Sequence, residues 1–252
     1  MPKFGIDVSL WQKGIDFKKA KAEGVEFVII KCSQSDYKDP QFENHYKAAK
    51  AVGLPVGAYH FCTATTVEEA KKEAETCLKA IKGKTFEYPI FLDFENSSGV
   101  DYRATGKATN DAIIKTFCET LEKAKYWVGI YFGLEFYKFY TSGPELASRY
   151  SHWLPYWATK APIGCQMWQF GGETNKLRSN KIAGMVCDQN YCYIDYPSLI
   201  KAKGLNGYRT VDDLAKEVIA GKWGAGLARR QALTKAGYNY SEVQARVNEL
   251  LK

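Results

Sequence analysis

The chain has 252 residues, of which 46% are hydrophobic and 25% are charged. This length allows one barrel-sized domain plus a small module, and no apolar stretch approaches the length needed to cross a membrane. The net charge of +7 is uneven, because residues 201–252 hold ten Lys and Arg against five Asp and Glu. Such a basic C-terminal region is expected to be attracted to an anionic surface, such as cell-wall polymer, nucleic acid or a membrane.

Seven cysteines are spread over the chain without a C-x-x-C pair, and most of them lie within apolar runs. An odd number in that setting favours buried free thiols in a reducing compartment over a disulfide framework. The N-terminus shows no basic-then-apolar leader, so the sequence predicts no signal peptide.

Apolar runs alternate with helix-forming segments through the first 200 residues. Strands are predicted around 3–9, 27–32, 55–61, 88–96, 126–131, 153–158, 166–170 and 184–189. Helices are predicted from Asp39 and Pro40, an N-cap followed by proline, from the capping box at Thr66, and from about Asn110. This alternation predicts an α/β protein with a distorted TIM-like barrel of eight strands, whose last crossovers are short or missing. An open doubly wound sheet is the alternative.

The apolar run 88–96 ends in two acids one residue apart. Because side chains alternate along a strand, Asp93 and Glu95 share one face, while Leu92 and Phe94 share the other. The buried run before them places the pair at the C-terminal end of a parallel strand, where barrels carry their chemistry. Close carboxylates push one pKa up and leave the other low, which suits general acid/base work on a glycosidic bond. The alternative is a strand end whose acids only cap a loop or pair with basic side chains.

Two further acids are predicted at strand ends, Asp7 on the first strand and Asp188 on the eighth. In a closed barrel these strands are neighbours, so the two acids should lie side by side and face Asp93 and Glu95 across the mouth. Four clustered carboxylates repel one another and reduce stability unless they are used or neutralised. The sequence therefore predicts a functional site at this rim.

Aromatic residues gather near the same strand ends. Their rings suit the flat C–H faces of sugars, which as a set predicts a carbohydrate groove, although any one of them alone is more often a core residue. They are Trp11, Tyr59, Phe61, Tyr131, Trp153, Tyr156, Trp157, Trp168 and Phe170.

Other chemistries find little support in the sequence. There are three histidines and no H-E-x-x-H or Cys/His cluster, which argues against a zinc enzyme. G-x-S-x-G, P-loop and strand-following G-x-G-x-x-G motifs do not occur. His60 and Cys62 lie in a fixed line on one strand, a weak basis for a cysteine peptidase. We expect no metal and no other cofactor.

The predicted secondary structure changes after residue 200, from alternating strands and helices to short helices alone. Residues 1–200 are predicted to form the barrel, 201–209 a linker, and 210–252 a bundle of three short helices. A core of that size is marginally stable in isolation. Its helix number and length resemble DNA-binding bundles, so nucleic acid is an alternative partner at this point.

Residues 1 to about 198 resemble glycoside hydrolase family 25, the Chalaropsis-type lysozymes or N-acetylmuramidases of phages, bacteria and fungi. The matching segments are GIDVS (5–9), GAYHF (57–61), FLDFE (91–95), GIY (129–131), WL (153–154), WA (157–158), WQF (168–170) and VCD (186–188). The resemblance implies a distorted α/β barrel that cleaves the β-1,4 bond after N-acetylmuramic acid in peptidoglycan.

The resemblance also implies roles for individual residues. Glu95 would be the general acid and Asp93 its carboxylate partner, with Asp7 and Asp188 completing an acidic floor. Asp93 could stabilise charge or orient the 2-acetamido group of the substrate, so substrate-assisted retention and inversion through a water both stay open. Tyr59 and Tyr131 would line the muramyl subsite and Trp168 the groove, with Phe61 and Trp157 as further substrate-binding residues.

Residues 210–252 resemble the CW-seven cell-wall-binding repeat, beginning with VIAGKWG (218–224). The repeat implies binding to the muramyl-peptide unit and disfavours nucleic acid. Its binding residues would include Trp223, Arg229, Tyr238, Tyr240 and Gln244. Ala225 stands where the family typically has Asn, which leaves one turn or ligand contact open. A single copy predicts weaker avidity than several copies would give.

Together these features predict a phage or prophage endolysin, a lysozyme that hydrolyses peptidoglycan for host cell lysis. Its partners would be the glycan strand and the muramyl peptide, without insertion into a membrane. It would stay in the host cytoplasm until lysis and then act at the cell wall, with a separate holin-like partner to permeabilise the membrane. A non-catalytic peptidoglycan-binding protein is the alternative function.

Overall fold

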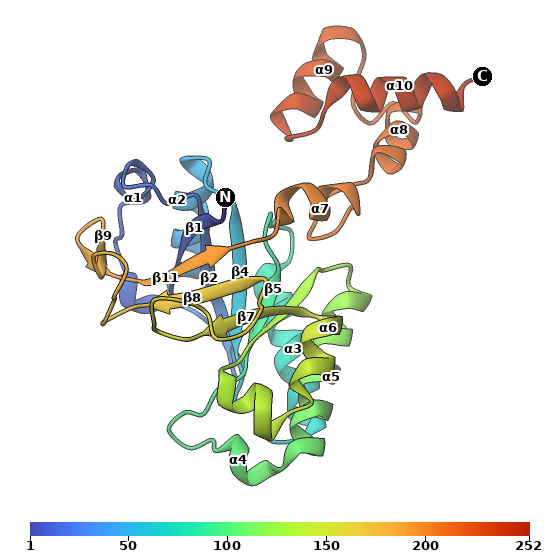
Figure 1. Ribbon diagram of the computed structural model, residues 1–252. Coiled ribbons are helices and arrows are strands. Elements are labelled where there is room, and N and C mark those ends of the chain that lie inside the picture. Colours follow the sequence, from blue (N-terminus) through green and yellow to red (C-terminus); the bar gives the residue numbers. More distant parts are fainter.

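The computed structural model describes residues 1–252, and eight of its strands close into a barrel (Figure 1). Around the barrel the order is β1, β11, β8, β7, β6, β5, β4 and β2, and β2 pairs again with β1. These strands are β1 (Lys3–Val8), β2 (Phe27–Gln34), β4 (Val56–Phe61), β5 (Ile90–Asp93), β6 (Val128–Tyr131), β7 (Ser151–Pro155), β8 (Met167–Gly171) and β11 (Asp188–Cys192). The predicted distorted barrel is confirmed, and the open sheet is wrong.

The eighth barrel strand differs from its prediction in both place and direction. β11 begins at Asp188 and runs antiparallel to β1 and β8, whereas the sequence predicted a strand at 184–189 that ends near this acid. Much of the predicted segment belongs instead to a hairpin of β9 (Lys181–Ile182) and β10 (Met185–Val186). Because β11 is reversed, its first residue lies at the rim where the parallel strands end.

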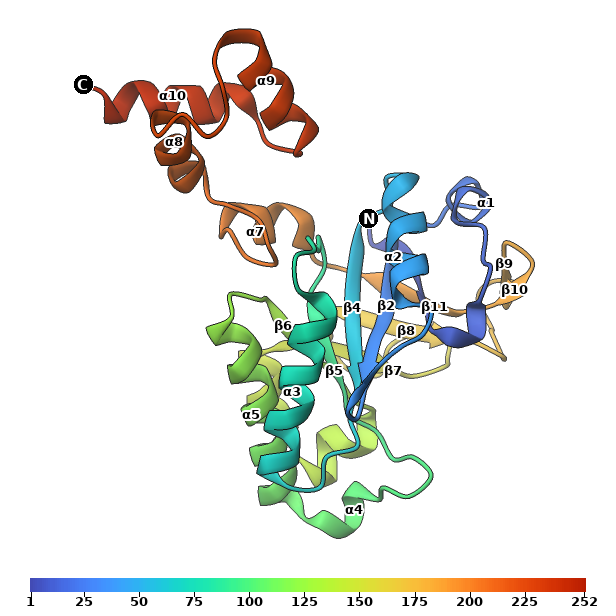
Figure 2. The same ribbon diagram turned by 180° about the vertical axis from the view of Figure 1, so that it is seen from behind.

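Helices cover one side of the barrel, and α3 and α5 pack side by side there (Figure 2). The helices before the C-terminal module are α1 (Phe17–Ala22), α2 (Phe42–Ala51), α3 (Val67–Ile81), α4 (Tyr102–Thr105), α5 (Lys107–Lys123), α6 (Gly143–Arg149) and α7 (Tyr196–Ala202). A 3-10 turn, η1 (Leu10–Gln12), and a π-helical turn, η2 (Phe136–Tyr140), add to them. No helix lies between β7 and β8 or between β8 and β11, as the predicted short crossovers require.

Of two helix N-termini predicted from the sequence, one is confirmed and the other is wrong. α3 begins with the predicted capping box, in which Thr66 caps the backbone of Glu69. α2 begins at Phe42, later than predicted, and Asp39 is not its N-cap. The buried carboxylate of Asp39 instead accepts hydrogen bonds from the backbone amides of Gln41 (2.8 Å) and Leu10 (3.2 Å). It thereby fastens the loop after β1 to the start of α2. A two-residue strand, β3 (Tyr37–Lys38), extends β2 nearby.

Aromatic side chains fill the barrel interior below the rim. Phe27, Phe91 and Trp153 belong to one buried cluster, with the rings of the last two 5.1 Å apart. Gly5 and Gly129 make room for them, because a Cβ at either position would lie 2.4 Å from the ring of Phe27 or Phe91. The barrel is therefore solid at mid-height, and ligands can enter only at its ends.

The C-terminal residues form a separate small core. α8 (Val211–Ile219), α9 (Gly226–Lys235) and α10 (Tyr240–Leu250) pack around Leu214, Ala215, Val218, Leu233, Val243 and Val247. This module stands away from the barrel beyond α7 (Figure 1). None of the helices in the protein combines the length and apolar character that crossing a membrane would require.

The segment 201–209, predicted as a linker, packs against the barrel base. Asn206 is fully buried, donates to the carbonyl of Tyr88 (2.8 Å) and accepts from the backbone amide of Trp127 (2.7 Å). Two residues on, the buried Tyr208 donates to the carboxylate of Glu87. These contacts fix the point from which the C-terminal module departs.

Candidate active site

The four acids predicted at strand ends line one cavity of about 210 Å³. Asp7 lies near the end of β1, Asp93 is the last residue of β5, Glu95 follows two residues later, and Asp188 opens β11. Asp7 and Asp188 are direct partners in the register of β1 and β11. The cavity therefore lies at the rim where the parallel strands end.

Asp7 is buried and anchored by two amides. Its Oδ2 accepts hydrogen bonds from Asn190 (2.8 Å) and Gln169 (3.1 Å). Burial raises the pKa of Asp7 to about 6, although the two amides favour the carboxylate and lower it. Repulsion from Glu95 adds to the rise. Asp7 is thus positioned by neutral donors.

Asp93 accepts no such hydrogen bonds from side-chain amides. It is buried, and its Oδ1 has no hydrogen-bond partner. Burial first, and then the charge of Glu95, raise the pKa of Asp93 well above its ordinary value, while the charge of Lys31 opposes them. Oδ1 is therefore an acceptor available to a donor on a bound ligand.

Glu95 is the carboxyl group suited to protonation near neutral pH. Burial and the charge of Asp188 raise the pKa of Glu95 to about 7, again opposed by Lys31. Such a value lets one group hold a proton and release it at neutral pH, which is what general acid catalysis needs. Since these acids interact, their protons belong to the set and not to one residue.

The pKa of Asp188 is raised as well. Burial and the charge of Asp7, followed by Glu173, raise the pKa of Asp188 to about 8. Gly172 explains how its carboxylate fits, because a Cβ at this glycine would lie 1.9 Å from Asp188 Oδ1 and 2.8 Å from the ring of Trp157. A larger residue there would displace the acid.

These raised pKa values predict how stability depends on pH. The folded protein binds protons to Asp7, Glu95 and Asp188 more tightly than the unfolded chain does, between the ordinary acid pKa near 4 and the folded values of about 6, 7 and 8. We therefore expect their contribution to the free energy of unfolding to fall as pH rises from about 4 to about 8. Relative to wild type, Asp188→Asn should gain about 1 to 3 kcal/mol between pH 5 and pH 8.

Urea titrations at the two pH values measure this gain. Asp36→Asn, at an exposed acid outside the cavity, is the control. The same pH dependence in Asp188→Asn as in wild type would contradict the prediction.

Aromatic side chains form the walls of the cavity. Tyr59, Phe61 and Tyr131 line it, together with Trp153 and the strongly exposed Trp11. The hydroxyl of Tyr131 donates to Gln169 Oε1 (3.0 Å) and its ring meets Trp153 edge-on at 4.7 Å. Flat rings around a polar floor suit a sugar.

Two predicted substrate-binding residues lie elsewhere. Trp157 is outside the cavity lining but beside it, because its Nε1 donates to Gln169 Oε1 (3.1 Å). Trp168 does not line the cavity, since it is buried and donates to the carbonyl of Tyr156 (2.8 Å). Alternation along β8 turns Gln169 inward and its two neighbours outward, so Trp168 packs with Phe170 in the outer core. Trp168 is a structural residue here.

Five polar residues of the site were not predicted. Ser9, Gln12, Lys31 and Gln169 line the cavity, and Asn190 donates to Asp7 Oδ2. The signal was strand parity: Lys31 follows Ile29 by two residues, and Asn190 follows Asp188 by two. None of the five is an acid or an aromatic residue, the two types from which the site was predicted.

The five predicted residues of the C-terminal module form two groups. Arg229 donates to Gln244 Oε1 (3.1 Å), and the hydroxyl of Tyr240 reaches the same oxygen (3.5 Å). Trp223 and Tyr238 meet edge-on at 6.1 Å. The polar groups of both rings form hydrogen bonds. The indole N–H of Trp223 donates to Glu217 (3.0 Å), and the Tyr238 hydroxyl accepts from the backbone amide of Arg209 (3.1 Å).

Ala225, the departure noted in the repeat, occupies the N-cap of α9 without a side-chain hydrogen bond. An Asn at that position could accept from the first turn of the helix, a contact worth about 1 kcal/mol. With Ala225, α9 lacks such a cap.

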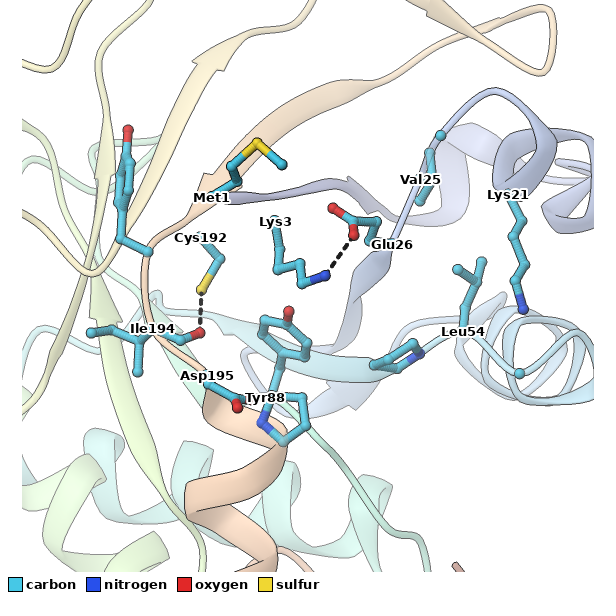
Figure 3. Close-up of a pocket in the computed structure, with 15 residues that line it drawn as sticks. Met1, Lys3, Lys21, Val25, Glu26, Leu54, Tyr88, Cys192, Ile194 and Asp195 are labelled. Carbon is cyan, nitrogen blue, oxygen red and sulfur yellow. Dashed lines mark hydrogen bonds and ion pairs between the residues drawn. The ribbon is translucent and has the colours of Figure 1, made fainter.

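A larger cavity, of about 610 Å³, lies at the opposite end of the barrel (Figure 3). It is lined by residues that precede the parallel strands, among them Lys3 and Glu26, which form an ion pair at 2.8 Å. Its acids do not converge, and barrels carry chemistry at the other end. Volume alone therefore does not identify the site, and the smaller, acid-lined cavity is the candidate.

Comparison with known proteins gives two sequence families. Residues 6–177 match the family described as Glycosyl hydrolases family 25, and residues 212–251 match the CW_7 repeat. The chain is 33% identical over 96 residues to the autolytic lysozyme of Clostridium acetobutylicum, which covers 38% of this chain and 29% of that protein. It is 26% identical over 252 residues to a lysozyme of Streptococcus phage Cp-7, which covers 97% of this chain and 69% of that protein.

Solved structures show the same architecture. The bacterial lysozyme from Streptomyces coelicolor superimposes with a TM-score of 0.67 and 23% identity, over 83% of this chain and 99% of that one. This likeness concerns the fold. The chain spans less than a third of the length of the clostridial relative.

Proposed function

Because the chain belongs to family 25 of the glycosyl hydrolases, we propose that it is a muramidase that hydrolyses the β-1,4 bond between N-acetylmuramic acid and N-acetylglucosamine in peptidoglycan. The observation that carries the proposal is the single cavity in which four carboxyl groups meet, one of them with a pKa of about 7. Aromatic walls around these acids suit a glycan chain.

In the proposed reaction Glu95 donates its proton to the glycosidic oxygen. As the bond to the anomeric carbon breaks, positive charge develops on the sugar ring, and Asp93 stabilises it from the cavity floor. The unpartnered Oδ1 of Asp93 can also accept the N–H of the 2-acetamido group, which would turn the acetamido oxygen toward the anomeric carbon. The charge of Asp188 raises the pKa of Glu95, and the charges of Asp7 and Asp188 raise the pKa of Asp93.

Product analysis tests the function directly. Purified protein is incubated with peptidoglycan, and the released fragments are reduced and identified by mass spectrometry. New reducing ends on muramic acid are expected. Reducing ends on glucosamine would indicate a glucosaminidase, and the lack of new ends would favour the alternative of a non-catalytic wall-binding protein, which the complete set of four acids argues against.

The C-terminal module is proposed to bind the wall through the muramyl-peptide unit, as its match to the CW_7 repeat suggests. Removing residues 210–252 should lower cosedimentation with cell walls by about tenfold or more, because a tethered second site raises effective concentration. The cut falls after Arg209, since Asn206 and Tyr208 are buried in the barrel base.

Hydrolysis of short soluble glycan strands by the truncated protein is the matched control and should stay close to wild type. Unchanged cosedimentation of the truncated protein would contradict the role of the module.

We further propose that the protein is an endolysin that lyses its host from within, by analogy with the phage lysozyme that it matches. In that setting it stays in the host cytoplasm until a separate holin-like partner permeabilises the membrane, and then acts at the wall. Expression in a host with and without such a partner tests this: lysis is expected only when both are present, and lysis by the protein alone would contradict it.

A further inference from the structure

Lys31 is the only cationic side chain that lines the acid-bearing cavity. It lies on β2, where Phe27 and Ile29, at the same parity, also face the barrel interior. Directly after Lys31 the pairing of β2 with β4 shifts in register. Such a bulge re-aims side chains beside active sites. Here it separates Lys31, which faces the acids, from Ser33, whose hydroxyl is 2.8 Å from His60 Nδ1 on the outer side of the barrel.

The ammonium group of Lys31 is held by neutral partners. Its Nζ donates to Gln34 Oε1 (2.5 Å) and lies 4.7 Å from the ring centroid of Phe61. It forms no direct ion pair, so the oxygens of Asp93 and Glu95 stay free for a substrate while its charge still acts on them through space. Burial lowers the pKa of Lys31, and the surrounding carboxylates oppose that effect.

Many titratable groups surround this amine. They are the carboxyl groups of Asp7, Asp93, Glu95 and Asp188 in the cavity, Asp39 on the segment before α2, the thiol of Cys32, the phenols of Tyr59 and Tyr131, and the imidazole of His60. Lys31 is the one positive charge among these carboxylates.

Asp7 and Asp93 differ in what can keep them ionised. Two side-chain amides favour the anion at Asp7, whereas Asp93 Oδ1 has no hydrogen-bond partner at all. Charge is therefore the remaining means by which the protein can favour ionised Asp93. We propose that Lys31 is a positioning residue whose charge favours the ionised form of Asp93 beside the proton donor; this inference rests on the muramidase function proposed above.

A neutral residue in place of Lys31 removes a positive charge that lowers the pKa of both Asp93 and Glu95. Both values must then rise. Activity needs ionised Asp93 and protonated Glu95, so both limbs of the pH profile should move to higher pH, by about one unit for a charge at this range in a partly buried site. A side chain that only fills space would lower the rate without moving the limbs.

The experiment compares the pH dependence of kcat/KM on soluble, uncross-linked glycan strands for wild type, Lys31→Met, Lys31→Gln and Lys31→Arg. The two neutral variants should shift both limbs upward by about one unit and lose about tenfold in rate on the acid side. Lys31→Arg should keep the limbs of wild type. Lys38→Met, which removes a positive charge paired with Glu43 outside the cavity, is the control and should not shift them.

A second readout does not depend on turnover. Carboxyl groups labelled with ¹³C in Asp and Glu are titrated by NMR in the protein without substrate, and the site signals should titrate at higher pH in Lys31→Met, or in Lys31→Gln if the first variant does not fold. Unmoved limbs and unmoved carboxyl titrations in a folded neutral variant would overturn the role of Lys31. Failure of wild type to make muramic acid ends would overturn the muramidase instead, so the two failures are distinguishable.

Discussion

Glu95→Gln is expected to lower kcat for peptidoglycan hydrolysis by about 10²- to 10⁴-fold, the range attributable to general acid catalysis. Gln occupies nearly the same volume and keeps a polar group beside Asp188, so the barrel should fold normally. It cannot transfer a proton to the glycosidic oxygen, and the leaving sugar would depart as an unprotonated alkoxide. The measurement is the initial rate of turbidity loss and of reducing-end formation with purified protein.

The control for this variant is Glu145→Gln. Glu145 lies on α6, and its exposed carboxylate is 3.3 Å from Lys115 Nζ. It does not line the cavity. The Glu145→Gln variant should clear cell walls at the wild-type rate. Near-normal clearing by Glu95→Gln would contradict the assignment of the proton donor, and it would direct attention to Asp188, the acid with the higher pKa.

Asp93→Asn is expected to lower kcat by about 10²- to 10³-fold, because an amide is neutral and removes the charge that faces the developing oxocarbenium ion. The acid limb of the pH profile that reports ionisation of Asp93 should also disappear, since Asn does not titrate. Rates within a few-fold of wild type, with the acid limb retained, would contradict both roles considered for Asp93. Asp36→Asn again provides the matched control.

The stereochemistry of the product separates substrate-assisted retention from inversion through a water. If Asp93 orients the 2-acetamido group, the wild-type enzyme should release the β-anomer first, by retention. If it instead activates a water on the opposite face, the first product should be the α-anomer. Proton NMR of the anomeric signal within the first minutes of digestion distinguishes them.

The sequence predicted the barrel and its acids because the relevant signals are local. Alternation along the 88–96 run fixes which face carries Asp93 and Glu95, and closure of the barrel brings Asp7 beside Asp188. The reversal of β11 was not predictable in the same way. A short polar strand such as DQNYC has no direction of its own, and only pairing with β1 and β8 defines it.

Two features could not be placed from residue type or composition. Trp168 looked like a groove residue by its type, but Gln169 takes the inward position on β8. The segment 201–209 looked like a linker by its composition, yet the side chain of Asn206 satisfies backbone groups of two distant loops. The two contacts span 79 and 118 positions of the sequence. No local sequence pattern encodes contacts at that separation.

The reversed direction of β11 has a consequence for how the enzyme can be re-engineered. An eighth strand parallel to its neighbours would release the chain at the rim, directly above the acids, and anything fused to it would crowd the glycan. The reversed strand delivers the chain to α7 and the barrel base, beside the N-terminus of β1. Exchanging the C-terminal module for another, or adding further copies, should therefore alter which walls are recognised while catalysis at the far end stays unimpeded.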